Sequence, residues 1–129
     1  MKLANLRLLV NDHDKCVEFY TQKLGFEENT EYSTDRYTSI NVGGGINDLG
    51  IYRSADMETN VGYTRKNAPN GYEKICLSFE VDSVEETYKT LKSRGVEFIK
   101  EPHEWDGAMV AHVRDPEDNL IEFYAWKGE

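Results

Sequence analysis

The chain has 129 residues, a length that suits one compact unit or two small modules packed together. Its 15 Lys and Arg against 24 Asp and Glu give a formal net charge of −9, which argues against nucleic acid and anionic membranes as partners. No apolar run reaches transmembrane length, no secretory signal follows Met1, and Cys16 and Cys76 form no CxxC motif. We therefore expect a reduced, cytoplasmic protein.

The first half of the chain predicts a strand, a helix and three further strands. The first strand covers residues 3–10, and the helix follows Asp12, a good N-cap residue. We expect this helix to bury four residues at helical spacing, namely Cys16, Val17, Tyr20 and Leu24. Gly25 suits the end of the helix, where a positive φ is needed. Three strand patterns follow, over residues 26–33, 36–43 and 48–54.

The second half repeats this order. Residues 55–72 are polar and turn-rich, so we interpret them as a connection, part of which should cover another surface. A strand over residues 74–81 then precedes a helix capped by Ser83, with Glu86 at capping-box spacing and Gly95 at its end. This helix should bury Val84, Tyr88 and Leu91. Strand patterns cover residues 97–105, 109–115 and 119–126.

The two halves match with nearly constant spacing. Val81 follows Val10 by 71 residues (81 − 10), whereas Gly95 follows Gly25 by 70 (95 − 25), so the second helix has lost one residue. Each half reads as a βαβββ module. The predicted organisation is module one at 1–54, the connection at 55–72 and module two at 73–129. We predict an α+β fold in which two tandem βαβββ modules form curved mixed sheets around a cleft.

The segment DPEDNLIEFY, Asp115 to Tyr124, predicts a tight turn and a closing strand. Pro116 presets φ for the turn, and Asp118 or Asn119 tolerates the left-handed conformation after it. Glu122 lies in the middle of the strand among large apolar residues, where a charge is costly without a partner. That partner is a metal, a ligand, a cation of the protein or water.

Three segments carry a resemblance to a known family: LRLLVNDHDKCVEFYTQKLGF, LSFEVDSVEETYKTLKSRGVEF and DPEDNLIEFY. Together they resemble the vicinal oxygen chelate superfamily, which includes glyoxalase I, bleomycin resistance proteins, fosfomycin resistance enzymes and extradiol dioxygenases. The last segment is similar to the Asp-Pro-Asp-Gly-Asn-Leu-x-Glu sequence that usually closes these proteins. The resemblance covers nearly the whole chain and implies the fold. It does not fix the chemistry, because this fold hosts several reactions and plain binding proteins.

The resemblance implies where a metal would be held. Metal-dependent members carry ligands on the first and last strands of each module, and these positions are Asn5, Gly50, Cys76 and Glu122 here. Only Glu122 is a usual ligand of this site, so we predict no metal and no cofactor, with a divalent metal disfavoured. Shifting the match at Gly50 by one residue would bring Asp48 towards the ligand position.

Strand alternation predicts which side chains line the cleft. Asn5 and Arg7 lie opposite an apolar face of the first strand. We place His103 and Trp105 in a loop before the seventh strand, and we leave the direction of His112 open. The predicted ligand-binding residues are Asn5, Arg7, Tyr37, Asn41, Tyr52, Cys76, Ser78, Trp105, His112, Glu122 and Tyr124. Arg7 is the leading cationic partner for Glu80 or Glu122.

These residues favour a metal-independent small-molecule binding protein, similar to the bleomycin-resistance-like members. We expect an aromatic or cationic ligand and a homodimer. One alternative is a metal-dependent glyoxalase- or dioxygenase-like enzyme that uses Cys76, His112 and Glu122 as non-standard ligands. Another is a metal-free enzyme with Glu122 or His112 as the base and Arg7 as an anchor. Whether the protein is an enzyme stays open at this point.

Overall fold

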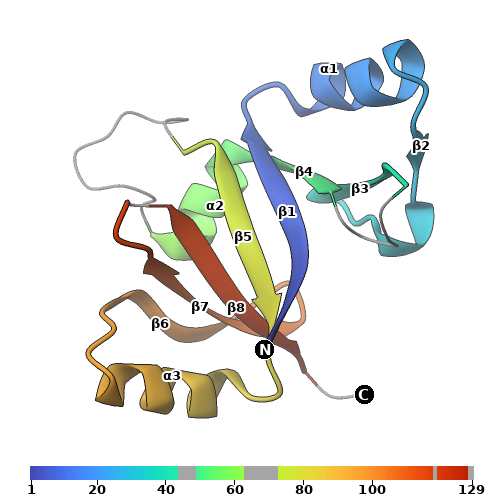
Figure 1. Ribbon diagram of the computed structural model, residues 1–129. Coiled ribbons are helices and arrows are strands. Elements are labelled where there is room, and N and C mark those ends of the chain that lie inside the picture. Colours follow the sequence, from blue (N-terminus) through green and yellow to red (C-terminus); the bar gives the residue numbers. More distant parts are fainter. Residues whose placement is uncertain (44–48, 63–72, 118, 128–129) are drawn as a thin grey trace. The chain divides into compact units, whose positions relative to one another are not determined.

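The computed structural model describes the chain except for residues 44–48, 63–72, 118 and 128–129 (Figure 1). Its contacts divide the chain into two compact units. We call Asn5–Cys76 the first unit, and Met1–Ala4 with Leu77–Glu129 the second unit. Within the described residues, no helix has the length and apolar character needed to cross a membrane.

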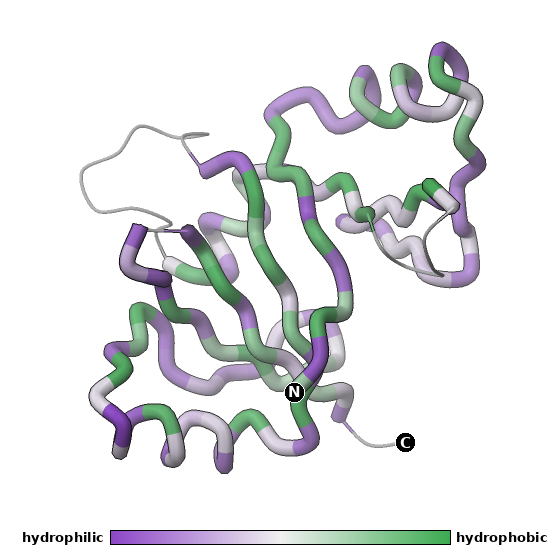
Figure 2. The backbone as a smooth tube through the Cα atoms, in the orientation of Figure 1, coloured by the Kyte–Doolittle hydropathy of each residue, from purple (hydrophilic) through white to green (hydrophobic). Residues whose placement is uncertain are grey.

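The first unit holds a four-stranded sheet in the order β2-β3-β4-β1 (Figure 1). Its strands are β1 (Lys2–Val10), β2 (Glu27–Glu28), β3 (Tyr37–Asn41) and β4 (Leu49–Arg53). β3 runs antiparallel to β2 and β4, whereas β1 runs parallel to β4. The register places Arg7 beside Gly50 and Tyr37 beside Tyr52, so these four residues share one face of the sheet. Figure 2 shows hydrophilic positions that interrupt the hydrophobic stretches of β1.

The first helix contains the extra residue that the repeat revealed. α1 (His13–Glu18) continues into a π-helix, η1 (Phe19–Lys23), in which the Leu24 N–H donates to the Phe19 carbonyl, five residues back. A π-turn accommodates one inserted residue without ending a helix. In the second unit the matching helix, α3 (Val84–Ser93), is a regular α-helix.

The predicted burial of the first helix is wrong. No residue of α1 or η1 is buried, and Leu24, just after them, has 51% of its surface exposed. The π-turn rotates the residues after it about the helix axis, so Leu24 leaves the apolar stripe that a regular helix would have continued. Gly25 has φ +87° and Gly95 has φ +89°, which confirms both as positions of positive φ.

Two other segments of the first unit differ from the prediction. The strand expected over residues 26–33 is only two residues long, and a 3₁₀ turn, η2 (Thr30–Tyr32), follows it. The Ser33 hydroxyl accepts from the Ser39 N–H, so a side chain takes the place of a ladder partner. The expected connection begins with a helix, α2 (Ser54–Val61), which buries Met57 and ends at Gly62 with φ +100°.

The second unit repeats the sheet in the order β5-β8-β7-β6 (Figure 1). Its strands are β5 (Ile75–Glu80), β6 (Phe98–Trp105), β7 (Ala108–Arg114) and β8 (Leu120–Trp126). One face of this sheet packs against α3 in a core of Val81, Val84, Ala111, Val113 and Phe123. Val84 is buried as predicted, while Tyr88 and Leu91 are only half-buried, and Leu91 packs against this core.

The predicted loop around His103 and Trp105 is part of β6. Pro102 is tolerated because β6 lies at the end of the strand order and its pairing with β7 shifts register between Lys100 and His103. Since His103 and Trp105 pair with Val110 and Ala108, both belong to the strand face that also carries His112.

The turn before β8 is built on Asp115. Its Oδ1 accepts the backbone N–H groups of Glu117 and Asn119, each at 2.9 Å, and its Oδ2 accepts from the Asn119 side chain at 2.9 Å. These bonds hold the pKa of Asp115 below its usual value, with the Asn119 side chain as the largest cause. Asn119 has no positive φ, and Asp118, the other expected left-handed residue, lies outside the described residues.

Candidate functional site

The second unit has a polar face on the side of its sheet away from α3. His112 pairs with Glu122 in the register of β7 and β8. Their sequence neighbours Ala111 and Phe123 belong to the core against α3. Since side chains alternate along a strand, His112 and Glu122 must point to the opposite face. The sequence left the direction of His112 open, and the structure turns it away from α3.

Glu122 is paired with side chains of its own unit. His112 Nε2 lies 2.9 Å from Glu122 Oε2, and the Ser78 hydroxyl donates to Glu122 Oε1 at 3.3 Å. His112 is fully buried and Glu122 is 1% exposed. Of the partners considered for Glu122, the protein itself therefore supplies at least these two. Sequence reasoning named all three residues but missed their contacts: the contact of His112 with Glu122 depends on the β7–β8 register, and that of Ser78 depends on the placement of β5 beside β8.

The other ring nitrogen of His112 is unusual. His112 Nδ1 is buried and has no hydrogen-bond partner within the described part of the chain. Buried polar atoms nearly always have such a partner, so an exception calls for an explanation. The ring of His103 lies beside it, with centroids 5.8 Å apart and a tilt of 38°.

Aromatic side chains share the strand face that carries His112. Tyr124 and Trp126 follow Glu122 on β8 at two-residue spacing, and their rings meet edge to face with centroids 5.8 Å apart. Trp105 lies on β6 on the same face, and Tyr124 and Trp105 are both half-buried. The face therefore combines a buried polar pair with aromatic surface.

The polar face of the first unit centres on Arg7. Its Cζ lies 5.4 Å from the Tyr37 ring centroid and 5.5 Å from that of Tyr52, distances typical of cation–π contacts. Arg7 Nε also donates to Asn5 Oδ1 at 3.2 Å. The guanidinium is thus oriented by an amide and two aromatic rings on the face where the sequence predicted ligand contacts.

Gly50 leaves space for the Tyr37 ring. A Cβ built on Gly50 would lie 1.9 Å from Tyr37 Cε1 and 2.6 Å from its hydroxyl oxygen. No side chain fits at position 50 while Tyr37 keeps this place. The resemblance puts a metal ligand at this position, so the first unit has an aromatic ring where that ligand would begin.

The residues present do not fit a metal site of the family type. Gly50 has no side chain, Asn5 is bound to Arg7, and Cys76 is fully buried. Within the described ranges, no three His, Cys, Asp or Glu side chains are grouped closely enough to hold a metal ion. The set of Cys76, His112 and Glu122 therefore fails as a ligand group here. Asp48, the other ligand considered, lies outside the described residues.

Two predicted residues have other contacts. Asn41 is exposed at the end of β3, where its side chain accepts from the Gly43 N–H at 3.1 Å. Glu80, one of the two carboxylates considered for Arg7, pairs with Lys2 of its own unit at 3.4 Å. The pairing of Arg7 with Glu122 stays a prediction.

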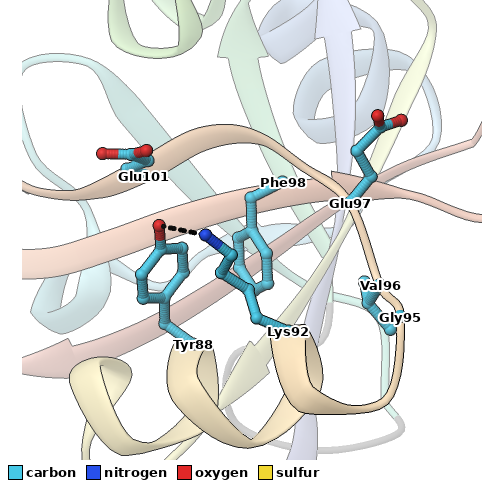
Figure 3. A pocket seen from close by; sticks show the side chains of 7 residues that line it. All are labelled: Tyr88, Lys92, Gly95, Val96, Glu97, Phe98 and Glu101. Carbon is cyan, nitrogen blue, oxygen red and sulfur yellow. Dashed lines mark hydrogen bonds between the residues drawn. The ribbon is translucent and has the colours of Figure 1, made fainter.

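A groove of about 540 Å³ lies between α3 and β6, on the α3 side of the second sheet (Figure 3). It is lined by Tyr88, Lys92, Gly95, Val96, Glu97, Phe98 and Glu101. Lys92 Nζ donates to the Tyr88 hydroxyl at 3.3 Å and lies over the same ring (Figure 3). Lys92, the only cation among these lining residues, is thus already bonded to Tyr88. None of the predicted site residues lines the groove.

Comparisons with known proteins agree with this architecture. The family model "Glyoxalase/Bleomycin resistance protein/Dioxygenase superfamily" matches residues 2–123. The uncharacterized protein YraH of Bacillus subtilis is 38% identical over 96% of this chain and 98% of its own length. A probable lactoylglutathione lyase of Vibrio cholerae is 32% identical over 94% of this chain and 88% of its own length.

A solved structure shows the same fold. Streptomyces coelicolor methylmalonyl-CoA epimerase, in complex with 2-nitronate-propionyl-CoA, aligns with a TM-score of 0.66 at 18% identity, covering 99% of both chains. The α+β fold and the family predicted from the sequence are both confirmed. The chain belongs to the glyoxalase/bleomycin resistance protein/dioxygenase superfamily.

Proposed function

We propose that this protein binds a small aromatic molecule without a metal ion, using side chains of a polar sheet face. The observation that carries the proposal is the Tyr37 ring over Gly50. A family-type ligand at position 50 would collide with this ring, and the same face offers two aromatic rings and a guanidinium. Such a surface suits a flat molecule with a few polar groups.

An aromatic ligand fits better than a cationic one. A cation would need a carboxylate as its counter-charge, and Glu122 is the buried carboxylate of the second face, while Glu80 is paired with Lys2. Both oxygens of Glu122 already take part in hydrogen bonds, with Ser78 and His112. The tyrosines of the first face lie around Arg7, which is itself a cation and would repel a positively charged ligand.

A metal-dependent lyase is the second candidate. The Vibrio cholerae relative, named a probable lactoylglutathione lyase, is 32% identical to this chain over 94% of its length. Glu122 also keeps a carboxylate at the last-strand position. This candidate requires ligands other than the set tested above, and its metal would supply a Lewis acid at the site.

Elemental analysis of untagged protein, with melting curves in chelator and in Zn²⁺, Ni²⁺, Mn²⁺ and Fe²⁺, separates the two. We expect no stoichiometric metal and no specific stabilisation. A screen of aromatic molecules in chelator should then find ligands that raise the unfolding free energy, by about 2.7 kcal/mol at 100 times the dissociation constant. A stoichiometric metal whose removal abolishes binding or turnover would favour the lyase.

We also propose a cytoplasmic homodimer. Exposed large apolar side chains include Leu3 and Trp126 on the second unit and Phe19 and Leu24 at the first helix. Exposed apolar surface of this kind is often covered in an oligomer. Light scattering during size-exclusion chromatography should give twice the mass of 14.9 kDa. A monomer at micromolar concentration would refute this part of the proposal.

A further inference from the structure

We propose that His112 Nδ1 accepts a hydrogen bond from a donor group of the ligand. The second unit would then select aromatic molecules that carry an O–H or N–H. This inference rests on the proposed function and adds the chemical class of ligand. Its basis is the buried Nδ1 atom, which has no hydrogen-bond partner among the residues that the structure describes.

In a neutral ring, the hydrogen bonds around Glu122 define the role of this atom. A carboxylate only accepts hydrogen bonds, so its contact with His112 Nε2 at 2.9 Å requires a proton on Nε2. The Ser78 hydroxyl donates to the other carboxylate oxygen. A neutral imidazole that donates through Nε2 leaves a lone pair on Nδ1. Ser78, Glu122 and His112 therefore form a chain that ends in an acceptor.

The environment of this lone pair favours a ligand as its partner. The atom is buried, so bulk water does not satisfy it, and an unmade hydrogen bond is costly there. The same strand face carries half-buried Trp105 and Tyr124, which provide apolar surface for an aromatic ring. A phenol or an indole combines such a ring with one donor, whereas a donor-free ring leaves Nδ1 unmatched.

The first test is on the protein alone. Protein labelled with ¹⁵N-histidine has three imidazoles, and the variant His112→Gln assigns the signals of His112 by their loss. We expect a neutral ring with its proton on Nε2 and a bare Nδ1. A proton on Nδ1 at neutral pH would overturn the inference without any ligand being involved.

The second test compares probes that differ in one proton: phenol with anisole, and indole with 1-methylindole, all in chelator. We expect phenol and indole to bind on the order of ten times more tightly than their methylated forms. His112→Gln keeps a side-chain amide near the Nε2 position and removes Nδ1, so the preference should disappear. His13→Gln, whose ring contacts Thr38 in the first unit, is the matched control and should keep it.

The outcomes separate this inference from the proposed function. If all four probes bind in chelator with equal affinity, the protein is a metal-free aromatic binder and the inference is wrong. A preference that persists in His112→Gln would also overturn it. If no probe binds in chelator while metal-loaded protein does bind, the proposed function fails and the inference fails with it.

Discussion

The Tyr37 ring lies over the α-carbon of Gly50, on the strand beside its own. Tyr37 pairs with Tyr52, two residues beyond Gly50, and its ring extends back along the sheet. A glycine inside a strand often marks such a close approach. The two residues therefore depend on each other, because the ring can stay only where no Cβ is present.

Substituting Gly50→Ala should destabilise the protein by about 1–3 kcal/mol, as overpacking does in a well-packed interior. Tyr37→Ala should also destabilise it, because it leaves a cavity. In the double variant the added methyl group enters that cavity, so the loss should be smaller than the sum of the two single losses. Urea unfolding of all four proteins gives the coupling energy.

Strict additivity would contradict this prediction, since it would mean that Gly50 and Tyr37 do not compete for space. A Gly50→Ala variant as stable as the wild type would contradict it as well. In that case position 50 could also carry a ligand side chain, and the argument against a metal would lose its main support.

Arg7→Met should lower the unfolding free energy by about 1–2 kcal/mol. The variant keeps most of the aliphatic packing but loses two cation–π contacts and the hydrogen bond to Asn5. Lys15→Met is the matched control, because Lys15 is exposed and its ion pair with Asp12 should contribute less than about 0.5 kcal/mol. Equal midpoints for the two variants in urea would show that Arg7 is not held by its neighbours.

Glu122→Ala should cost about 2–6 kcal/mol, because it leaves two buried donors, the His112 Nε2–H and the Ser78 hydroxyl, without their acceptor. Glu122→Gln should cost less, about 1–2 kcal/mol, because its amide can still accept from His112 and bond to Ser78. Glu117→Ala, at an exposed position of the preceding turn, serves as the control and should change stability by less than about 0.5 kcal/mol.

The decisive result is the ranking of the three losses in unfolding free energy, and chemical denaturation at neutral pH measures all three. A Glu122→Ala variant no less stable than Glu122→Gln would mean that the hydrogen bonds of Glu122 contribute nothing. The chain from Ser78 to His112 would then lose its physical basis.

Most of the fold could be predicted because its signals are local. Alternation in the strands, the cap residues Asp12 and Ser83, and the terminal glycines Gly25 and Gly95 depend on near neighbours in sequence, and the structure confirms them. Leu24 is exposed because one extra residue changes the phase of the side chains after it, but this cause does not apply to Cys16 and Val17, which precede the π-turn and are half-buried. The change of the repeat offset from 71 to 70 residues indicates the extra residue, but a prediction from a regular period of 3.6 residues does not allow for it.

The site was predicted less completely because its contacts join residues far apart in sequence. Alternation placed Arg7, Ser78 and Glu122 on their faces correctly. Alternation alone could not show that His112 lies across from Glu122, since a shift of one residue in the β7–β8 register would turn the His112 side chain to the other face. The fit of Tyr37 over Gly50 was equally out of reach, because it depends on a rotamer and not on a pattern.

Deleting Gln22 should leave the protein folded with a melting temperature within a few degrees of the wild type. Gln22 is exposed and lies in η1, so its loss converts the π-turn into regular helix of the length found in α3. The control is deletion of Ser93, the residue of α3 that matches Lys23 once Gln22 is treated as the extra residue (93 − 23 = 70), and this deletion should strongly destabilise the protein. α3 is a regular α-helix without an inserted residue, and the deletion moves Gly95 out of its positive-φ position.

Circular dichroism and thermal melting compare the two deletions directly. Equal damage from both would mean that the π-turn is required and is not an accommodated insertion. A melting temperature above that of the wild type for the Gln22 deletion would strengthen the interpretation, because a regular helix makes better hydrogen bonds than a π-turn.

Asn119→Ala should raise the pKa of Asp115 towards its ordinary value of 3.8. The Asn119 side chain is the largest cause of the lowered pKa, and its bond from Nδ2 to Asp115 Oδ2 is lost in the variant. Because the folded pKa is depressed, the carboxylate's contribution to stability is present above pH 3.8 and is lost as the pH falls through the lower folded value. Removing the Asn119 side chain should therefore make stability less dependent on pH below 3.8. ¹³C NMR titration of the Asp115 carboxyl in both proteins measures the shift, and a wild-type value at or above 3.8 would show that the turn does not favour the carboxylate.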